Sequence, residues 1–562
     1  MPTDFAAVAR LHCRVTVGTT PRKHTNENRY AHRWYRASFH LKVGYRFCAK
    51  MAKRFCQVAI IRFDKLWRVL YYSSPRILPA IGMKVIGNIE WKRQDTNMEI
   101  RPFKAFRFNS AVVGDVGKCI APPFDVISPC QQEQLYQRSQ YNIVRITKGK
   151  TNPCDDDSNN QYTRAAQYLA RWMQQGVLKQ DSTEAIYAYV QDFQLAGTAL
   201  QRLNFIALAK LEDFGPPGCV RPHEQILNEQ LSDRLKLKRA TEARFGLVFM
   251  LYEDQQKIAE KIIKKVCLAT EDTECTEIKK CNTSSEFSVL SVAKCDSPLI
   301  DFVNDDSVRH RVYAITSKRD IDAIAAMMSD KTCIIADGHH RYTTGLYYCN
   351  ESNNPAARYQ MLAFANTCQD GLKVLATHRL VGNLDNFDIN QLIAELKEDF
   401  EVTELRFSSA NGRDRARQKM LAMMKAEYDN NETAFGIYAG ENRFYLAVLT
   451  NKQAMDSAAP DKSAAWRKLD ASILHKLVLE KLLGIDQENL AKGQNLEYIK
   501  DTPVAINDAI SQIRSRQKQV IFFMNPIKMQ QLKMVTDAGE RMPPKSTYFY
   551  PKMYTGLTIQ KL

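Results

Sequence analysis

Hydrophobic and polar positions follow short, regular patterns from residue 98 onward. Residues 185–214 hold two long apolar stretches on either side of Gly197, which predicts a β-hairpin. Residues 245–252 (FGLVFMLY) are almost wholly apolar and predict a buried strand. In 317–330 the apolar side chains share one face of a helix, and 331–336 then predicts another strand. Strands and helices are therefore expected to intermix along the chain.

The same patterns predict further elements in the second half of the chain. Ser232 is interpreted as the cap of a helix that begins there. Because strands and helices intermix, we predict a mixed α/β fold for residues 98–562, either as one body or as two lobes with a linker near 454–464. The remaining predicted strands are 310–315, 358–366 and 519–526, and the remaining helices are 232–243, 340–349, 390–400 and 469–484.

Residues 1–97 differ from the rest in charge and pattern. They carry 19 Lys and Arg against 5 Asp and Glu, which leaves 60 against 57 in residues 98–562 of a chain with net charge +17. They show no sustained helical or strand period. We interpret them as upstream sequence read through in frame, with Met98 as the true start. A transit peptide for an organelle and a basic nucleic-acid arm are the alternatives.

Charge and cysteine content exclude some classes for the body, residues 98–562. Its near-neutral balance argues against tight nucleic-acid binding. No apolar run reaches the roughly 18 residues of a membrane helix, and no secretory signal is seen. The 14 cysteines include no C-x-x-C pair, and the spacing of Cys267, Cys275, Cys281 and Cys295 does not suit zinc. We expect free thiols in the reducing cytoplasm.

The stretch CIIADGHHRYTT (333–344) carries the clearest chemical signal. An apolar strand ends at Asp337, Gly338 permits a sharp turn, and a helix follows with His339, His340 and Arg341 in its first turn. Helix N-termini bind anions, and an arginine fork suits phosphate. Both histidines can donate hydrogen bonds to phosphoryl oxygens, and Asp337 could hold Mg²⁺ or take a proton. The pattern predicts a phosphate or nucleotide site.

Two other interpretations of this stretch stay open. The adjacent histidines could bind a transition metal, although neighbours on a helix point about 100° apart and chelate poorly. Asp337 could simply cap the helix, but capping would not explain the run of two histidines and an arginine.

Other polar stretches supply candidates for the same reaction. Asp125 sits in a turn stiffened by two prolines, and His223 and Glu224 share a loop. Asp125, Glu224 and Asp337 are candidate bases, because a transferase needs a carboxylate to take the acceptor's proton. Packing of the aromatic C-terminal segment onto the body is an equal alternative for its residues. His378 and Arg379 follow a predicted strand. The candidates for substrate or phosphate binding are His223, His378, Arg379, Lys545, Ser546, Thr547 and Lys552.

Across residues 98–562 the chain closely resembles the bacterial and archaeal domain-of-unknown-function family 1015. The DGHHR run also resembles the phosphate motif of the ParB/sulfiredoxin superfamily, especially its free serine kinases. The stretches that carry the family resemblance are, in order, RPFKAFRFN, APPFDVIS, YNIVRI, PHE, DRLKL, IADGHHRY, THRLV, LLGID, MNPIK and MPPKSTYFYPKMYTGL.

This chain differs from the sulfiredoxin and ParB motifs, and these differences reduce the number of activities that the resemblance implies. Sulfiredoxins carry a reactive cysteine where this chain has His339, so their redox chemistry is not expected. ParB proteins carry Gly-Glu-Arg-Arg, bind CTP and add a helix-turn-helix domain, and no such domain is evident here. The serine kinases carry the closest motif, Asp-Gly-His.

The resemblance therefore implies a ParB/sulfiredoxin-like nucleotide-binding core that uses Mg²⁺ and ATP or ADP. It implies transfer of a phosphoryl group to a small hydroxyl acceptor such as free serine. A nucleotide-binding regulator that transfers nothing, a metal-dependent hydrolase that uses the histidines, and a nucleic-acid protein acting through residues 1–97 are the rival hypotheses.

Overall fold

The computed structural model describes residues 98–215, 218–225, 228–275, 297–486, 489 and 495–562. Every described residue belongs to one compact unit, which ends at Leu562. The predictions made for residues 1–97, and those for Cys281 and Cys295, lie outside the described residues. The division of the body into lobes stays a prediction.

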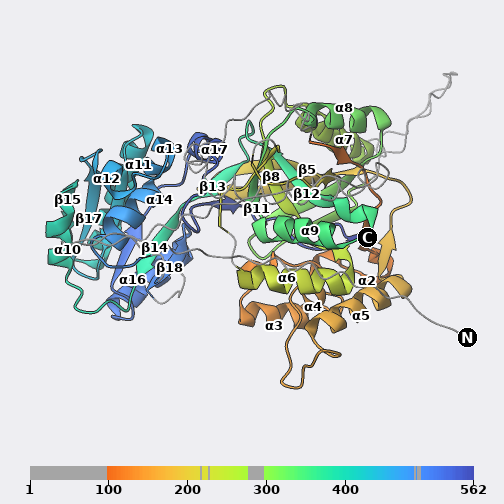
Figure 1. The fold of residues 1–562 in the computed structure, drawn as a ribbon, viewed down its shortest axis with the longest axis horizontal. Coiled ribbons are helices and arrows are strands. Elements are labelled where there is room, and N and C mark those ends of the chain that lie inside the picture. Colours follow the sequence, from red (N-terminus) through yellow and green to blue (C-terminus); the bar gives the residue numbers. More distant parts are fainter. Residues whose placement is uncertain (1–97, 216–217, 226–227, 276–296, 487–488, 490–494) are drawn as a thin grey trace, which may run out of the picture. The chain divides into compact units, whose positions relative to one another are not determined.

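The larger sheet of the described chain has nine strands in mixed orientation (Figure 1). The path through it is β6-β11-β8-β12-β5-β4-β10-β9, and β1 pairs with β5 off this path. The β11–β6 and β12–β8 pairs are parallel and the others antiparallel. The strands are β1 (Ile100–Arg101), β4 (Ile186–Leu195), β5 (Thr198–Lys210), β6 (Val220–Arg221), β8 (Val248–Tyr252), β9 (Ile300–Val303), β10 (Arg309–Ile315), β11 (Cys333–Asp337) and β12 (Tyr359–Asn366).

Both faces of the central strands are buried, which explains why β8, β11 and β12 are apolar almost without interruption. Along β4, Ala188 and Val190 face one hydrophobic cluster, while Tyr187 and Tyr189 face the other. Helices α7 and α8 pack on the first face, and α5 and α6 on the second (Figure 1). The helices around the sheet are α5 (Gln161–Gln174), α6 (Asn228–Thr241), α7 (Ile258–Cys275), α8 (Lys318–Met328) and α9 (His339–Glu351).

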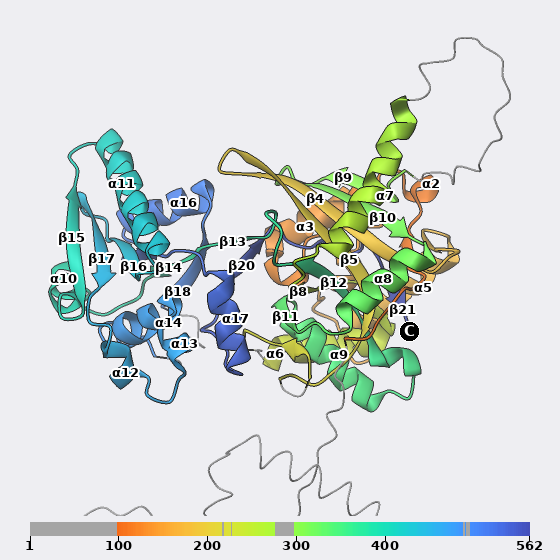
Figure 2. The same ribbon diagram turned by 90° about the horizontal axis from the view of Figure 1, so that it is seen from above.

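A second sheet of six antiparallel strands has the order β15-β17-β16-β19-β14-β18. Helices α11 and α16 cover one face of it, and its other helices cover the opposite face (Figure 2). Its elements are β14 (Thr377–Val381), β15 (Phe400–Arg406), β16 (Ala434–Tyr438), β17 (Arg443–Leu449), β18 (Leu496–Lys500), β19 (Val520–Phe523), α10 (Ile389–Leu396), α11 (Ala410–Asp429), α12 (Ala454–Ala458), α13 (Ala464–Arg467), α14 (Asp470–Ile473), the π-helix η6 (Leu474–Glu480) and α16 (Pro503–Arg514).

Three small strand pairs bring distant parts of the chain together. The C-terminal segment takes part in two of them, so residues near 550 lie beside residues near 374 and residues near 560 beside 244. The remaining elements are β2 (Phe106–Phe108) with β3 (Leu178–Gln180), β13 (Lys373–Leu375) with β20 (Tyr548–Tyr550), β21 (Gln560–Lys561) with β7 (Ala243–Arg244), α2 (Ser110–Val113), η2 (Val116–Lys118), η3 (Phe124–Val126), α3 (Pro129–Arg138), α4 (Val144–Thr147), η5 (Pro355–Arg358) and α17 (Met529–Asp537).

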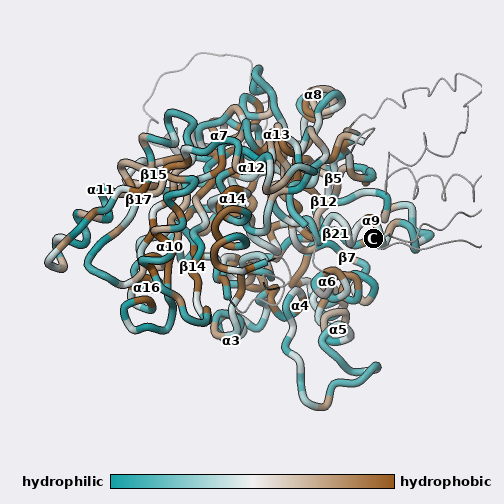
Figure 3. The backbone as a smooth tube through the Cα atoms, turned by 60° about the vertical axis from the view of Figure 1, so that its left-hand side comes forward, coloured by the Kyte–Doolittle hydropathy of each residue, from teal (hydrophilic) through white to brown (hydrophobic). Residues whose placement is uncertain are grey.

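The mixed α/β class is confirmed, and so are the hairpin β4–β5, strands β8, β10, β11, β12 and β19, and helices α8 and α9. The long apolar strands appear as brown stretches among teal, hydrophilic segments (Figure 3). Regular periodicity therefore identified the elements whose side chains enter a core on one face or both.

Three predicted helices have different bounds. The helix expected from Ser232 begins at Asn228, so Ser232 lies inside α6 and does not cap it. The helix predicted for 390–400 ends at Leu396, because Phe400 already starts β15. The helix predicted for 469–484 consists of α14 and a π-helix that ends at Glu480. Residues 454–464, where a linker was expected, contain α12.

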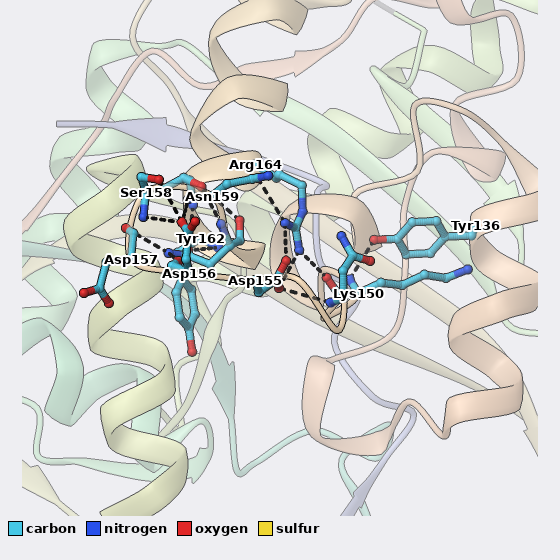
Figure 4. A network of polar contacts seen from close by, with 12 residues as sticks. Tyr136, Lys150, Asp155, Asp156, Asp157, Ser158, Asn159, Tyr162 and Arg164 are labelled. Carbon is cyan, nitrogen blue, oxygen red and sulfur yellow. Dashed lines mark hydrogen bonds and ion pairs between the residues drawn. The ribbon is translucent and has the colours of Figure 1, made fainter.

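Ion pairs and caps hold the polar loop 151–160 in place (Figure 4). The Arg164 guanidinium donates to both carboxylate oxygens of Asp155, at 2.7 and 2.9 Å, and to the carbonyl of Lys150 at 2.8 Å. Asn160 caps α5 by accepting from the backbone N–H of Tyr162 at 2.9 Å. The loop is thus tied to the helix that follows it.

Candidate functional site

The DGHHR run forms a strand, a one-residue turn and a helix, as the sequence predicted. The β11–β8 register shifts between Ile335 and Asp337, which marks a β-bulge immediately before the carboxylate. Gly338 follows with a φ of +94°, a left-handed conformation that favours glycine. Gly338 is also the N-cap of α9, and no side chain caps the helix there. The alternative in which Asp337 caps the helix is therefore wrong.

Asp337 instead pairs with two cations. Its Oδ2 accepts from Lys552 Nζ at 2.7 Å, and its Oδ1 accepts from Arg341 Nη2 at 3.4 Å. All three side chains are largely buried, with exposed fractions of 16%, 17% and 13%. Burial alone would raise the pKa of Asp337, but Lys552 and Arg341 outweigh it and hold this pKa well below its usual value. The carboxylate is therefore ionised at neutral pH.

The guanidinium of Arg341 lies beside the turn at Gly338, and only some of its N–H groups have hydrogen-bond partners. One Nη donates to the carbonyl oxygen of Leu247, whereas Nε has no hydrogen-bond partner among the described residues. A Cβ added to Gly338 would lie 3.2 Å from Arg341 Cζ and 3.2 Å from Val248 Cα. Glycine at 338 thus serves both the turn and the close approach of the arginine.

His223 and His339 form a buried pair beneath the turn, with ring centroids 4.6 Å apart. The carbonyl of Ile335, 2.5 Å from His223 Nδ1, can only accept, so Nδ1 carries the proton. His223 Nε2 then accepts from the Thr547 hydroxyl at 2.9 Å. His339 Nε2 accepts from the backbone N–H of His223 at 3.2 Å. Burial lowers the pKa of both histidines, so both are neutral.

These contacts separate the two histidines of the motif. His339 is only 3% exposed and is used inside the protein, as is His223 at 1%. His340 is partly exposed, and burial is the main cause that lowers its pKa. The carboxylates of Glu224 and Asp125 lie near enough to oppose that lowering. Both candidate bases are therefore close enough to His340 for their charges to influence it.

The C-terminal segment reaches the same place. The backbone N–H of Lys545 donates to Glu224 Oε1 at 3.1 Å, and the Ser546 hydroxyl donates to the carbonyl of Pro543 at 2.6 Å. Lys552 Nζ lies 4.5 Å from the centre of the Tyr548 ring. Phe549 also packs on Phe249, with ring centroids 5.8 Å apart. The segment therefore contributes polar groups to the site and packs against the core.

His378 and Arg379 lie in a different sheet. They were expected after a strand, but both belong to strand β14 and are 1% exposed. His378 Nδ1 accepts from the backbone N–H of Met524 at 3.1 Å. Neither makes a hydrogen bond or ion pair with Asp337, Gly338 or Arg341 within the described part of the chain. They therefore do not bond to the glycine turn, although Arg379 shares the lining of a cavity with Ser546 of the C-terminal segment.

A cavity of about 70 Å³ opens beside Arg341. Arg234, Lys238 and Arg244 line it together with Arg341, and none of the described lining residues is Asp or Glu. Burial lowers the pKa of Lys238 far below its usual value, with Arg244 adding to the effect. None of these three residues was predicted from the sequence, although Arg234 and Lys238 at i and i+4 share one face of a helix.

The side chains around Asp337 do not by themselves form a magnesium site. Both carboxylate oxygens already face cations, and the described residues contain no group of three or more His, Cys, Asp or Glu placed to hold a metal ion. Asp337 could act as a Mg²⁺ ligand only if one of its carboxylate oxygens left the cation that it now faces. The metal-dependent hydrolase stays a hypothesis. In the part of the chain that the structure describes, no helix combines the length and apolarity needed to span a membrane.

These observations describe a mixed α/β protein whose candidate site lies where a buried strand meets a helix N-terminus. A model of the family described as "Protein of unknown function (DUF1015)" matches residues 100–472. The match covers more than half of the 562 residues, so the chain belongs to this family. The family predicted from the sequence is confirmed.

A search of curated proteins gave no match. Solved structures similar to this chain include a mutant free serine kinase in complex with ADP, at 11% identity, covering 59% of this chain and 83% of that one, with a TM-score of 0.28. A conserved hypothetical protein from Pyrococcus furiosus is similar at 13% identity, with coverage of 61% and 91% and a TM-score of 0.27. C-terminally truncated SbnI from Staphylococcus aureus is similar at 10% identity, with coverage of 62% and 84% and a TM-score of 0.28. Likeness at these TM-scores does not bear on the activity of this chain.

Proposed function

We propose that this protein is a nucleotide-dependent phosphotransferase that moves a phosphoryl group from ATP or ADP to a small hydroxyl acceptor such as free serine. The observation that carries the proposal is the cavity beside Arg341, which four basic side chains line without a carboxylate among the described lining residues. Arg341 and Arg234 already pair with Asp337 and Asp233. A polyphosphate would supply negative charge to Lys238 and Arg244, for which the described residues provide no ion pair, and it would favour the charged form of Lys238.

Phosphate binding is assigned to the first turn of α9. The backbone N–H groups of this turn and the positive end of the helix dipole attract an anion. Gly338 lets a phosphate approach the backbone, and the guanidinium of Arg341, which lines the cavity, would place positive charge beside it. His340 would donate a further hydrogen bond from its neutral ring. His339 is assigned a positioning role, because its ring is used inside the protein.

Chemistry would occur on the exposed side of the same turn. Glu224 or Asp125 would take the proton from the acceptor's hydroxyl group, whose oxygen then attacks the terminal phosphorus of the nucleotide. The phosphorus–oxygen bond to the nucleotide breaks, and ADP or AMP leaves with that electron pair. Asp337 would hold Lys552 and Arg341 in place, so that their charges face the transferred group. Lys545 and Thr547 lie beside the proposed base and would contact the acceptor.

The choice of acceptor rests on the motif's resemblance to the free serine kinases. Magnesium would arrive with the nucleotide, since Mg²⁺ commonly binds through substrate phosphates and keeps several waters. No step is assigned to an ion held by the protein alone.

The proposal can be tested on the full chain with a matched pair of variants. Arg341→Ala should weaken ADP binding in calorimetry about 10-fold or more, because a charge-assisted hydrogen bond is lost. Arg164→Ala removes a partly buried arginine of α5 that binds the loop 151–160 (Figure 4), and it should leave ADP affinity unchanged. Equal affinities in both variants would refute the site assignment.

Turnover would be followed by ³¹P NMR with Mg²⁺, ATP or ADP, and a pool of hydroxy amino acids. A new phosphomonoester that requires an acceptor would establish transfer. Nucleotide binding without a product would instead identify a regulator and overturn the proposed reaction.

A further inference from the structure

Two buried polar side chains of the nine-stranded sheet bind the C-terminal segment. Gln191 of β4 and Arg202 of β5 are opposite each other in the strand register, and both are 0% exposed. The Arg202 guanidinium donates to the carbonyl oxygen of Tyr550 at 3.3 Å and to that of Pro551. The Gln191 amide donates to the carbonyl oxygen of Lys552 at 3.1 Å. The two side chains, called the Gln191–Arg202 clamp below, therefore bind three consecutive backbone carbonyls.

Neighbouring side chains keep the clamp in one position. Gln191 Oε1 accepts from Arg202 Nε at 3.1 Å and from the Asn204 amide at 3.4 Å. Arg202 Cζ lies 4.8 Å from the centre of the Phe249 ring, against which Phe549 packs. Because each member of the clamp is held by contacts on several sides, its N–H donors point in fixed directions.

Arg202 is a cation that the fold buries without a carboxylate as its partner. No ion pair of its side chain is found in the described part of the chain. Burial lowers the pKa of Arg202 to about 10, while Tyr189 and Asp337 oppose this, so the guanidinium is charged at neutral pH. A buried charge is costly, but the planar guanidinium presents five donors at once, which a lysine ammonium group cannot match in the same geometry.

Lys552 connects the clamp with the candidate site. Gln191 binds its carbonyl oxygen, and its ammonium group donates to Asp337 Oδ2 at 2.7 Å. The residue is therefore held both by its backbone and by the tip of its side chain. A lysine side chain loses rotamer freedom when its tip is fixed, and an unfixed backbone would add to that entropic cost. Fixing the backbone of Lys552 therefore favours its ion pair.

We propose that Arg202 and Gln191 are positioning residues that keep Lys552 on Asp337 and so fix the charges at the candidate site. They act through the backbone of residues 550–552, because neither side chain has exposed surface with which to touch a ligand. The inference deepens the proposed function, and its meaning for phosphoryl transfer rests on that function. The anchoring of Lys552 does not rest on it and can be measured without nucleotide.

The test is acetylation of the full chain by sulfosuccinimidyl acetate, without nucleotide, followed by peptide mass spectrometry. The rate at Lys552 is compared with the rate at Lys518, which is similarly shielded. The two side chains are 17% and 14% exposed, and Lys518 pairs with Glu497 of β18. In the wild type both amines should react slowly, because each becomes accessible only when its contacts open. The ratio of the two rates distinguishes local release of Lys552 from general loosening of the protein.

Two variants weaken the clamp in different ways. Arg202→Lys keeps the charge but loses the planar set of donors, and it should raise the rate at Lys552 relative to Lys518 about 10-fold. Gln191→Glu keeps an acceptor for Arg202 and supplies the counter-charge that Arg202 lacks, so it should fold even if Arg202→Lys does not. It removes only the donor to the Lys552 carbonyl, and it should also raise the ratio.

Arg145→Lys is the matched control, because Arg145 also donates to two backbone carbonyls, those of Tyr136 and Ser139, in another part of the fold. It should leave the ratio unchanged. An unchanged ratio in the folded clamp variants would overturn the inference. An equal rise at Lys518 would overturn it as well, since the clamp would then stabilise the whole protein without positioning Lys552.

The same variants connect the clamp with phosphoryl transfer. If the wild type shows turnover, both should lower kcat about 10-fold with a smaller change in KM, because the charge of Lys552 faces the transferred group in the proposed reaction. An unchanged kcat would overturn the role of the clamp in transfer. Absence of turnover in the wild type would refute the proposed function alone, since acetylation of Lys552 requires neither nucleotide nor acceptor.

Discussion

Lys552→Met tests whether the ion pair at the glycine turn stabilises the site. Lys552 Nζ and Asp337 Oδ2 are 2.7 Å apart, and the two side chains are 17% and 16% exposed. At an effective dielectric constant of about 20, the attraction over that distance is about 6 kcal/mol. Desolvation of both ions offsets much of it, and the residual exposure screens the rest. We therefore expect the variant to lose about 2 to 4 kcal/mol of unfolding free energy.

A double-mutant cycle isolates the pair from other effects of each change. Lys552→Met leaves Asp337 with only the longer contact to Arg341, and Asp337→Asn leaves two cations without their common partner. The double variant removes both charges of the pair. Its destabilisation should therefore be smaller than the sum of the two single variants by about 2 kcal/mol or more.

Urea unfolding followed by circular dichroism measures all four proteins. Coupling below about 0.5 kcal/mol would refute the assignment of this pair as a stabilising contact. Because the pKa of Asp337 is held low in the folded protein, its stabilisation is present above the unfolded-state pKa and is lost as pH falls through the folded-state pKa. Removing Lys552 raises the folded-state pKa of Asp337, so acid unfolding should begin at a higher pH in Lys552→Met.

Two further predictions concern single side chains. Gly338→Ala places a Cβ 3.2 Å from Arg341 Cζ at a φ of +94°, and it should lower the free energy of urea unfolding by about 1 to 3 kcal/mol. The loss should exceed that of Gly539→Ala, where φ is +74° and nothing lies within 4 Å of the added Cβ; equal losses would contradict the role of the close approach. Burial raises the pKa of Asp470 in the folded protein to about 7, so between about pH 5 and pH 7.5 the unfolded chain binds fewer protons than the folded one and the wild type loses stability as pH rises. Asp470→Asn lacks this titration, so its free energy of unfolding relative to the wild type should rise by about 2 to 3 kcal/mol over that range. A pH-independent difference from the wild type would contradict this.

The sequence predicted the strand–turn–helix of the candidate site because local rules govern each part of it. Residues 333–336 are apolar on both faces of a buried sheet, Gly338 needs a positive φ, and α9 starts directly after it. The hairpin β4–β5 could be predicted in the same way, because its turn centres on Gly197, whose φ is +79°. Elements of this kind are specified by residues close together in the chain.

Long-range contacts could not be predicted in the same way. Lys552 was a candidate only because it is basic, and nothing in the sequence pairs it with Asp337, which lies 215 residues earlier. The burial of His339 depends on the His223 backbone, which the irregular segment after β6 brings to it. Arg379 looked like a loop residue after a strand because THRLV contains few apolar residues, yet cores on both faces bury β14.

The two cavities differ in a way that explains why only one has a sequence signature. Beside Arg341 the basic side chains come partly from one helix face, at positions 234 and 238, and from the turn itself. On the second sheet, Arg379 and Asp470 are 91 residues apart in the chain and line the same cavity. A short motif can encode the first arrangement because a helix fixes its spacing. The second depends on elements that are far apart in the chain, so a short motif cannot encode it.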